Sequence, residues 1–334
     1  CNQWYDAGHV ENYFVSKQML LKARYFNSLR FDRESKIVTK TSQNITKLIN
    51  EIEWYQQIPD DLSELTPKII DVDQSKNPFL KLEYIKHPTL AELWLYGDFS
   101  PKLWMEMLDE LFEILNQFKK HSGIVGVDDY DLIYKTKTEN RLSELTNSNE
   151  SFKKILTSDI LLINGKKYRN WPAIKEEIEL QIHDLYHEND NCLIHGDLCF
   201  SNIFCDFKGR NFKLIDPRGK WGSTMFGDMK YDVAKLRHSL VGGFDTIVNG
   251  LCTASLTESN HISMKIFEPK NHQQICRYLD ELIQNRWNLN EIKLIEGLLF
   301  ISMLPLHKDN FERQLSFYSI GIQRLNEVLG TSDE

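Results

Sequence analysis

The chain has 334 residues, of which 41% are hydrophobic and 26% are charged, so it can bury a sizeable core. Its 40 Lys and Arg residues against 48 Asp and Glu residues give a formal net charge of -8. This balance provides no general basic surface for nucleic acid or anionic lipid, and we expect neither as a partner.

The cysteines and the apolar runs indicate the cellular compartment. The six cysteines, at positions 1, 192, 199, 205, 252 and 276, have no paired CxxC spacing, which is typical of the reducing cytoplasm. The longest apolar run, "GLLFISMLPL" at 297–306, is too short to span a bilayer. We expect a cytoplasmic protein without a transmembrane helix. Because it starts at Cys1, we expect a fragment of a longer chain rather than the mature end of a lipoprotein.

The first elements predict a small sheet with one helix. Two runs rich in aromatic and β-branched residues flank the turn "DRES" within 23–42, which predicts a β-hairpin with Lys40 at the end of its second strand. Apolar residues recur at helical spacing in 44–58, and Pro59 ends that pattern. Two more strands are predicted in "PKIIDVD" and "PFLKLEYI".

From about residue 98 onward the pattern is mostly helical. The clearest amphipathic runs are 101–121 and 171–188, and two more helices are predicted over 289–307 and 310–329. The polar stretch "TKTENRLSELTNSNESF" is expected to form loops and short helices.

The stretch "CLIHGDLCFSNIFCDFKGRNFKLIDPRG", residues 192–219, carries the candidate chemistry. Asp197 precedes Asn202 by five residues and Asp216 by nineteen, and a strand-turn-strand hairpin between them would return Asp216 to Asn202. An amide and a carboxylate oxygen suit Mg²⁺, which leaves its other positions to water and phosphate. Asp197 would then accept the proton of an attacking hydroxyl. The set predicts phosphoryl transfer from a nucleotide.

At these residues the chain resembles the aminoglycoside phosphotransferase and choline kinase superfamily, whose fold is similar to that of protein kinases. The similarity rests on "HGDLCFSN", "LIDPRG" and the later "GDMKYDVAKLRHS", and it extends over about residues 22–325. It implies an α+β, two-lobed fold: a small antiparallel-sheet N-lobe with one helix over 22–90, and a larger helical C-lobe over 91–334.

The resemblance also implies roles for single residues. Lys40 would hold the α and β phosphates of ATP and pair with Glu51, which we choose over Glu53 although helical phase leaves both open. The other implied roles are adenine contacts by the backbone near Glu83, Tyr84 and Ile85, Mg²⁺ ligation by Asn202 and Asp216, catalysis by Asp197, and structural anchoring by His195 and Asp232.

The family's phosphate-covering loop is often rich in glycine, but "KARYFNSLRF" contains none. Backbone amides of residues 26–28, with the side chains of Asn27 and Ser28, are the expected contacts instead. No GxxxxGK[ST] motif is present, which excludes a P-loop kinase.

The acceptor is predicted to be a small alcohol bound against the helical lobe. Its candidate contacts are Arg218, Trp221, His307, Asp309 and Arg313, with Trp221 covering a sugar face or a quaternary ammonium. An arginine directly after "IDP" suits an anionic or hydroxyl-rich acceptor at least as well as a cation, which favours a sugar or polyol over choline. Choline, ethanolamine and aminoglycosides stay as alternatives.

The first residues, "QWYDAGHVENYFVSKQ", resemble the WxDxG-containing tail of bacterial sugar-nucleotide nucleotidylyltransferases. We therefore interpret 1–21 as the tail of a preceding nucleotidylyltransferase domain, or alternatively as a lead-in helix. In the first case the phosphorylated product would feed a nucleotide-activated precursor for bacterial surface polysaccharide.

Three other chemistries compete with this interpretation. A metallophosphoesterase needs a later GNH[DE] motif, which does not follow. A cysteine hydrolase built on Cys199 and His195 has no evident third group to orient it. A catalytically inactive, nucleotide-binding pseudokinase remains open.

Overall fold

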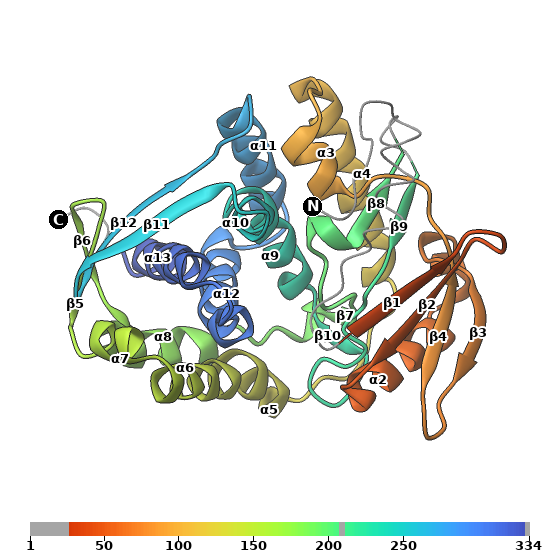
Figure 1. Ribbon diagram of the computed structural model, residues 1–334, viewed down its shortest axis with the longest axis horizontal. Coiled ribbons are helices and arrows are strands. Elements are labelled where there is room, and N and C mark those ends of the chain that lie inside the picture. The colour runs from red at the N-terminus through yellow and green to blue at the C-terminus, as the bar shows by residue number, and fades with distance from the viewer. Residues whose placement is uncertain (1–26, 207–210, 331–334) are drawn as a thin grey trace, which may run out of the picture.

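The computed structural model describes residues 27–206 and 211–330 and has a mixed α+β fold (Figure 1). A small antiparallel sheet with one α-helix forms the N-terminal part, and a larger, mainly helical part follows it. The predicted fold class is confirmed. The interpretation of residues 1–21 concerns residues outside the described ranges.

The N-terminal sheet has the strand order β1-β2-β4-β3, and all its neighbouring pairs are antiparallel. Its strands are β1 (Asn27–Asp32), β2 (Ile37–Ser42), β3 (Ile69–Asp73) and β4 (Phe79–Glu83). The predicted hairpin is therefore present as β1 and β2. Lys40 lies in central strand β2, between Leu29 and Leu80, and only 6% of it is exposed.

Helix α2 (Ile45–Gln57) connects β2 to the 3-10 helix η1 (Asp60–Leu65). It begins after Asn44, whose side chain accepts a hydrogen bond from the amide of Lys47 at 3.0 Å, and it ends before Pro59. Leu48, Ile52, Trp54 and Tyr55 of this helix are buried together with Glu51. The sequence pattern thus located this helix correctly at both ends.

The larger part is built mainly from helices. They are α3 (Leu90–Tyr96), α4 (Pro101–Lys119), α5 (Val127–Tyr130), η2 (Asp131–Thr136), α6 (Lys137–Ser148), α7 (Glu150–Ile155), α8 (Trp171–His183), η3 (Glu188–Asp190), η4 (Phe200–Asn202), α9 (Met229–Leu240), α10 (Phe244–Val248), α11 (His272–Gln284), α12 (Leu289–Ser302), η5 (Leu304–His307) and α13 (Phe311–Val328). None of the helices in the described residues is long and apolar enough to cross a membrane.

The stretch 136–152 was predicted to form loops and short helices; the helices are present, as α6 and α7, but the loops are not. The buried residues of α6 are Thr138, Leu142 and Leu145, which form a narrow side of the helix. Most other residues of this helix are polar, so the sequence did not show a clear amphipathic pattern. A second four-stranded sheet was also missed. It has the order β11-β12-β5-β6 and contains β5 (Ile160–Ile163), β6 (Lys166–Arg169), β11 (Cys252–Glu258) and β12 (His261–Ile266).

Two short strand pairs support the candidate site. Strands β8 (Ile203–Cys205) and β9 (Phe212–Leu214) form the predicted hairpin, in which Ile203 lies opposite Leu214. Strands β7 (Asn191–Leu193) and β10 (Phe226–Asp228) form the other antiparallel pair.

Helix α9 lies in the centre of the larger part, and all of its residues are buried. Five of them are charged or histidine, and groups of this kind need polar partners when they leave water. Arg237, for example, pairs with Glu296 of α12 and donates from Nε to Asp280 of α11 at 2.8 Å. Polar pairing therefore holds this helix in one position.

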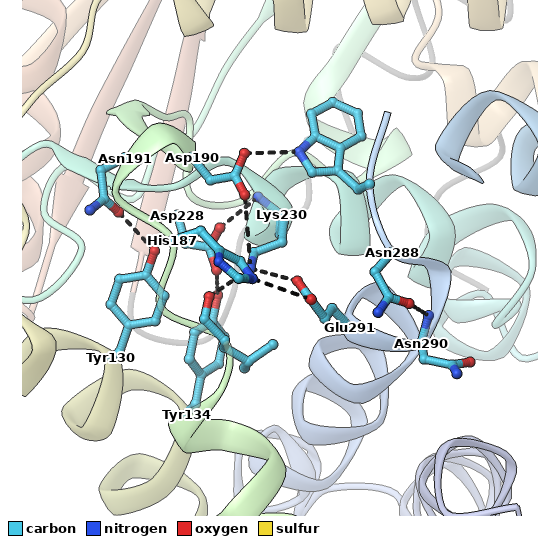
Figure 2. A network of polar contacts seen from close by, with 12 residues as sticks. Tyr130, Tyr134, His187, Asp190, Asn191, Asp228, Lys230, Asn288, Asn290 and Glu291 are labelled. Carbon is cyan, nitrogen blue, oxygen red and sulfur yellow. Dashed lines mark hydrogen bonds and ion pairs between the residues drawn. The ribbon is translucent and has the colours of Figure 1, made fainter. Parts of the chain in front are cut away.

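A polar network fastens the start of α9 (Figure 2). The Nζ of Lys230, a fully buried residue, donates to the Leu185 carbonyl at 2.6 Å and to Glu291 of α12 at 2.7 Å. Tyr134 of η2 donates to the Asp228 carboxylate at 2.9 Å. These contacts connect α9 to α12 and strand β10 to η2.

Replacing Lys230 with methionine should lower the free energy of unfolding by about 3 kcal/mol, because it leaves the Glu291 carboxylate without its buried partner. A urea titration followed by circular dichroism measures this loss. The matched control is Lys175→Met, which breaks an ion pair with Glu139 that is more exposed. Equal unfolding midpoints for the two variants would contradict the expectation.

Candidate active site

A carboxylate of helix α9, that of Asp232, fixes the chain just before Asp197. Asp232 accepts hydrogen bonds from the backbone amides of His195 at 2.7 Å and Gly196 at 2.8 Å. Gly196 has φ +75°, a conformation that glycine adopts without strain, and a Cβ there would lie 2.7 Å from the Cβ of Arg218. These contacts determine the path of the chain into Asp197.

The His195 side chain connects the two halves of the site. Its Nε2 lies 3.0 Å from the Ile215 carbonyl oxygen, and its Nδ1 lies 3.3 Å from the amide nitrogen of Asp197. The first contact needs a proton on Nε2 and the second needs an acceptor at Nδ1, so the neutral Nε2–H tautomer satisfies both. Burial lowers the pKa of His195 to about 4.

This pKa predicts an effect of pH on stability. Because the pKa of His195 is lower in the folded chain than its usual value of 6.5, protons favour the unfolded chain. The stabilisation is complete above about pH 6.5 and is lost as the pH falls toward 4, by up to about 3 kcal/mol. The free energy of unfolding of wild type and of His195→Asn can be measured by urea titration at several pH values. The difference between the two should shrink as the pH falls from 6.5 to 4, and a constant difference would contradict the prediction.

The β8–β9 hairpin brings the other two polar residues to Asp197. Asn202 Nδ2 donates to the Asp197 carbonyl at 2.9 Å and to Asp197 Oδ2 at 3.2 Å. The amide of Ile215, the residue before Asp216, donates to the Asn202 carbonyl at 3.0 Å. Both side-chain contacts use the nitrogen of the Asn202 amide, so neither requires its Oδ1, the atom that could ligate a cation.

Lys40 of the N-terminal sheet reaches this hairpin. Its Nζ lies 2.6 Å from Asp216 Oδ1 and 2.7 Å from Glu51 Oε2. Burial opposes the charge of Lys40, but these two carboxylates outweigh it and raise the lysine pKa. Glu53 was the alternative to Glu51 as the partner of Lys40. Its Oε2 lies 3.2 Å from the Nζ of Lys220 instead. The structure thus brings Lys40, Glu51 and Asp216 together.

Asp216 combines an unusual backbone with an accessible carboxylate. Its φ is +56°, in the left-handed region that few residues other than glycine adopt. Its side chain is 47% exposed. Desolvation raises the pKa of the Asp216 carboxyl, but the charge of Lys40 has the larger combined effect and lowers it. The accessible, ionised carboxylate of Asp216 and the amide oxygen of Asn202, whose backbone hydrogen-bonds to Ile215, are a donor set that fits Mg²⁺ completed by phosphate and water.

Lys235 was not among the residues predicted from the sequence. Its Nζ lies 2.9 Å from Asp197 Oδ1. The two carboxylate oxygens of Asp197 therefore differ, since Oδ2 faces Asn202 and Oδ1 faces Lys235. A signal was present in "YDVAK", where Lys235 follows Asp232 by three residues and so shares its side of the helix.

Two of the three backbone amides expected to contact adenine already donate hydrogen bonds within the N-terminal part. The Glu83 amide donates to the Lys68 carbonyl at 3.0 Å, and the Tyr84 amide donates to the Lys36 carbonyl at 2.9 Å. Both N–H groups are therefore engaged, so of the three backbone amides only that of Ile85 stays a candidate donor to adenine.

The predicted phosphate contacts lie at the start of strand β1. Asn27 pairs with Ser42, and Ser28 is exposed and pairs with Thr41. The remaining predicted contact, residue 26, lies outside the described ranges.

The five predicted acceptor contacts do not form one group. Arg218 packs over Gly196 and its amide donates to the His195 carbonyl at 2.8 Å. His307, Asp309 and Arg313 lie together instead, where Arg313 donates to the Val248 carbonyl at 3.3 Å.

The expectation that Trp221 covers a ligand is wrong. The residue is 1% exposed, and tyrosine rings pack edge-on around it, including Tyr130 at a centroid distance of 5.1 Å. It is a core residue because its large apolar surface gains more from burial than from a place at the surface.

The thiol of Cys199 does not have the properties of a nucleophile. Burial raises its pKa to about 12, and its Sγ lies 3.2 Å from Ser201 Oγ. Both ring nitrogens of His195 have other partners. The cysteine hydrolase is therefore disfavoured.

With this geometry established, the chain can be compared with known proteins. It has the fold of the aminoglycoside phosphotransferases. The ADP-bound crystal structure of aminoglycoside phosphotransferase APH(2'')-Ib aligns with a TM-score of 0.51 and 15% identity over 95% of this chain and 97% of that chain. The APH(2'')-IIa complex with gentamicin aligns with a TM-score of 0.50 and 16% identity, over 96% and 97% of the two chains. No protein-family model and no curated protein sequence matches the chain.

Proposed function

We propose that the chain is an ATP- and Mg²⁺-dependent kinase that phosphorylates a hydroxyl group of a small molecule. The observation that carries this proposal is the position of Lys40, which joins Glu51 in the N-terminal part to Asp216 in the catalytic hairpin. A buried cation held by two carboxylates beside Asp197 and Asn202 suits a nucleotide whose phosphates lie between the two parts. The ADP-bound structure with the same fold supports this choice of ligand.

The side chains would divide the reaction among them. Lys40 would contact the α and β phosphates and Glu51 would keep it in position. Asn202 and Asp216 would hold Mg²⁺, which when bound neutralises phosphate charge. Asp197 would orient the acceptor hydroxyl and take its proton while the acceptor oxygen bonds to the γ phosphorus. The bond from that phosphorus to the bridging oxygen breaks, and its electron pair leaves with ADP.

For the acceptor we propose a sugar, a polyol or an amino alcohol. A cytoplasmic role in supplying a nucleotide-activated precursor for surface polysaccharide is the finer hypothesis, and it depends on the resemblance of the first residues. Gentamicin in a structure of the same fold favours an aminoglycoside as an alternative. The residues 22–90 and 91–334 would be two lobes that enclose the nucleotide.

The test is to incubate the purified chain with ATP, Mg²⁺ and a panel of sugars, polyols, choline, ethanolamine and aminoglycosides. Mass spectrometry should detect an acceptor heavier by one phosphoryl group. A chain that binds ATP but phosphorylates nothing would be a pseudokinase, and a chain that does not bind ATP would contradict the proposal altogether.

A further inference from the structure

Three cationic side chains surround Tyr231, in the first turn of α9. Lys137 Nζ lies 5.4 Å from the centroid of its ring, and Arg218 Cζ lies 5.9 Å from the same centroid. Arg218 also donates from Nη1 to the Tyr231 hydroxyl at 3.2 Å. Lys235 follows on the same side of the helix, four residues after Tyr231. We call Lys137, Arg218 and Lys235 the cationic cluster.

The cationic cluster lies directly beside the candidate base. Lys235 contacts Asp197 Oδ1 at 2.9 Å, and Arg218 packs on Gly196, the residue before Asp197. Asn202, a proposed Mg²⁺ ligand, contacts the other oxygen, Oδ2. The cluster therefore faces the side of Asp197 that is turned away from the proposed metal and nucleotide, which is where an acceptor would approach.

The positive charge of the cluster is poorly balanced. Within 27–206 and 211–330, neither Lys137 nor Arg218 has a carboxylate at ion-pair distance, and the Arg218 guanidinium donates to the Lys220 carbonyl and the Tyr231 hydroxyl. Burial and then the neighbouring charges of Arg218 and Lys235 lower the pKa of Lys137 well below its usual value. Among the described residues, only Lys235 of the cluster has a carboxylate partner, so Lys137 and Arg218 together are the complement of an oxyanion.

We infer that the acceptor alcohol carries an oxyanion, a phosphate or a carboxylate, which the cationic cluster binds while the hydroxyl meets Asp197. This inference rests on the proposed kinase function and specifies its substrate class. Arg218 offers a planar pair of donors, and Lys137 offers an amine whose protonated form a bound anion would stabilise, so the two can contact one anionic group from two sides. A cationic acceptor such as choline would instead be repelled by the cluster.

The experiment compares matched alcohols with and without an anionic group: glycerol 3-phosphate with glycerol, and glucuronate with glucose. In at least one pair the anionic member should be phosphorylated with kcat/KM higher by about tenfold or more, the usual gain from a charge-assisted contact. The variant Lys137→Met should raise KM for that member by about tenfold and reduce the preference. The matched control Lys135→Met removes a lysine two residues earlier that pairs with Glu179, and should keep wild-type values.

The inference would be overturned if the neutral member of both pairs had a kcat/KM equal to or higher than that of the anionic member. It would also be overturned if the Lys137→Met variant changed only the KM for ATP. Calorimetric titration of the same alcohols without nucleotide separates this inference from the kinase proposal. If no alcohol is phosphorylated, the kinase proposal fails. If an anionic alcohol binds the wild-type chain but not the Lys137→Met variant, the inference that the cluster binds an oxyanion is still supported. If the anionic and neutral alcohols bind equally well, that inference is rejected.

Discussion

Replacing Asp197 with asparagine is expected to lower kcat about a thousandfold and to leave the dissociation constant for ATP nearly unchanged. The amide has almost the same shape, but it cannot take a proton from the acceptor hydroxyl. Its oxygen can still accept a hydrogen bond from Lys235, which now lies 2.9 Å from Asp197 Oδ1. Product formation by mass spectrometry and ATP binding by calorimetry measure the two quantities separately.

A matched control for this variant is Asp206→Asn, which makes the same chemical change at the end of strand β8, where the carboxylate accepts from Asn211 Nδ2 at 2.6 Å. It should retain wild-type turnover. If folded Asp197→Asn protein keeps turnover within about tenfold of wild type, Asp197 is not the base.

Replacing Lys40 with methionine should weaken ATP binding and also lower the free energy of unfolding, by about 3–5 kcal/mol. The stability loss follows because Glu51, which is 2% exposed, would stay buried without its partner. Adding Glu51→Gln to the Lys40→Met variant should recover much of the stability but not the ATP affinity. Urea unfolding and calorimetry measure these two effects.

The matched control is Lys81→Met in the neighbouring strand β4, where Lys81 forms an exposed pair with Asp71 at 2.8 Å. Exposed pairs contribute about 0–1 kcal/mol, so this variant should unfold near the wild-type midpoint. A Lys40→Met variant as stable as the Lys81→Met variant would mean that the Lys40 pair is not needed for the fold.

Some parts of the candidate site could be predicted because they lie on one short hairpin. The antiparallel pairing of β8 with β9 places Asp216 near Asn202, and Asp197 is only five residues before Asn202. The helix after Lys40 could be found for a similar reason, since its apolar spacing and the stop at Pro59 are local signals.

Other predictions failed where packing decides the outcome. Nothing in the composition around Trp221 tells a ligand-stacking tryptophan from one enclosed by tyrosines, because the enclosing rings come from α5, η2 and α9. The β5–β6 hairpin did carry a signal that went unused, since Asn164 and Gly165, both with positive φ, are a favoured turn pair.

By itself, the sequence determined the fold class, the first hairpin with the helix after it, and the β8–β9 hairpin that joins Asn202 to Asp216. These depend on periodicity, turn residues and spacing within a few tens of residues. Only the tertiary structure decided which charges meet: Lys40 with Asp216, Lys235 with Asp197, and Lys137 with Arg218 around Tyr231. Such pairings join segments far apart in the chain. The free energy that selects them comes from burying many apolar side chains at once. It is a property of the whole fold, so a short stretch of sequence does not reveal it.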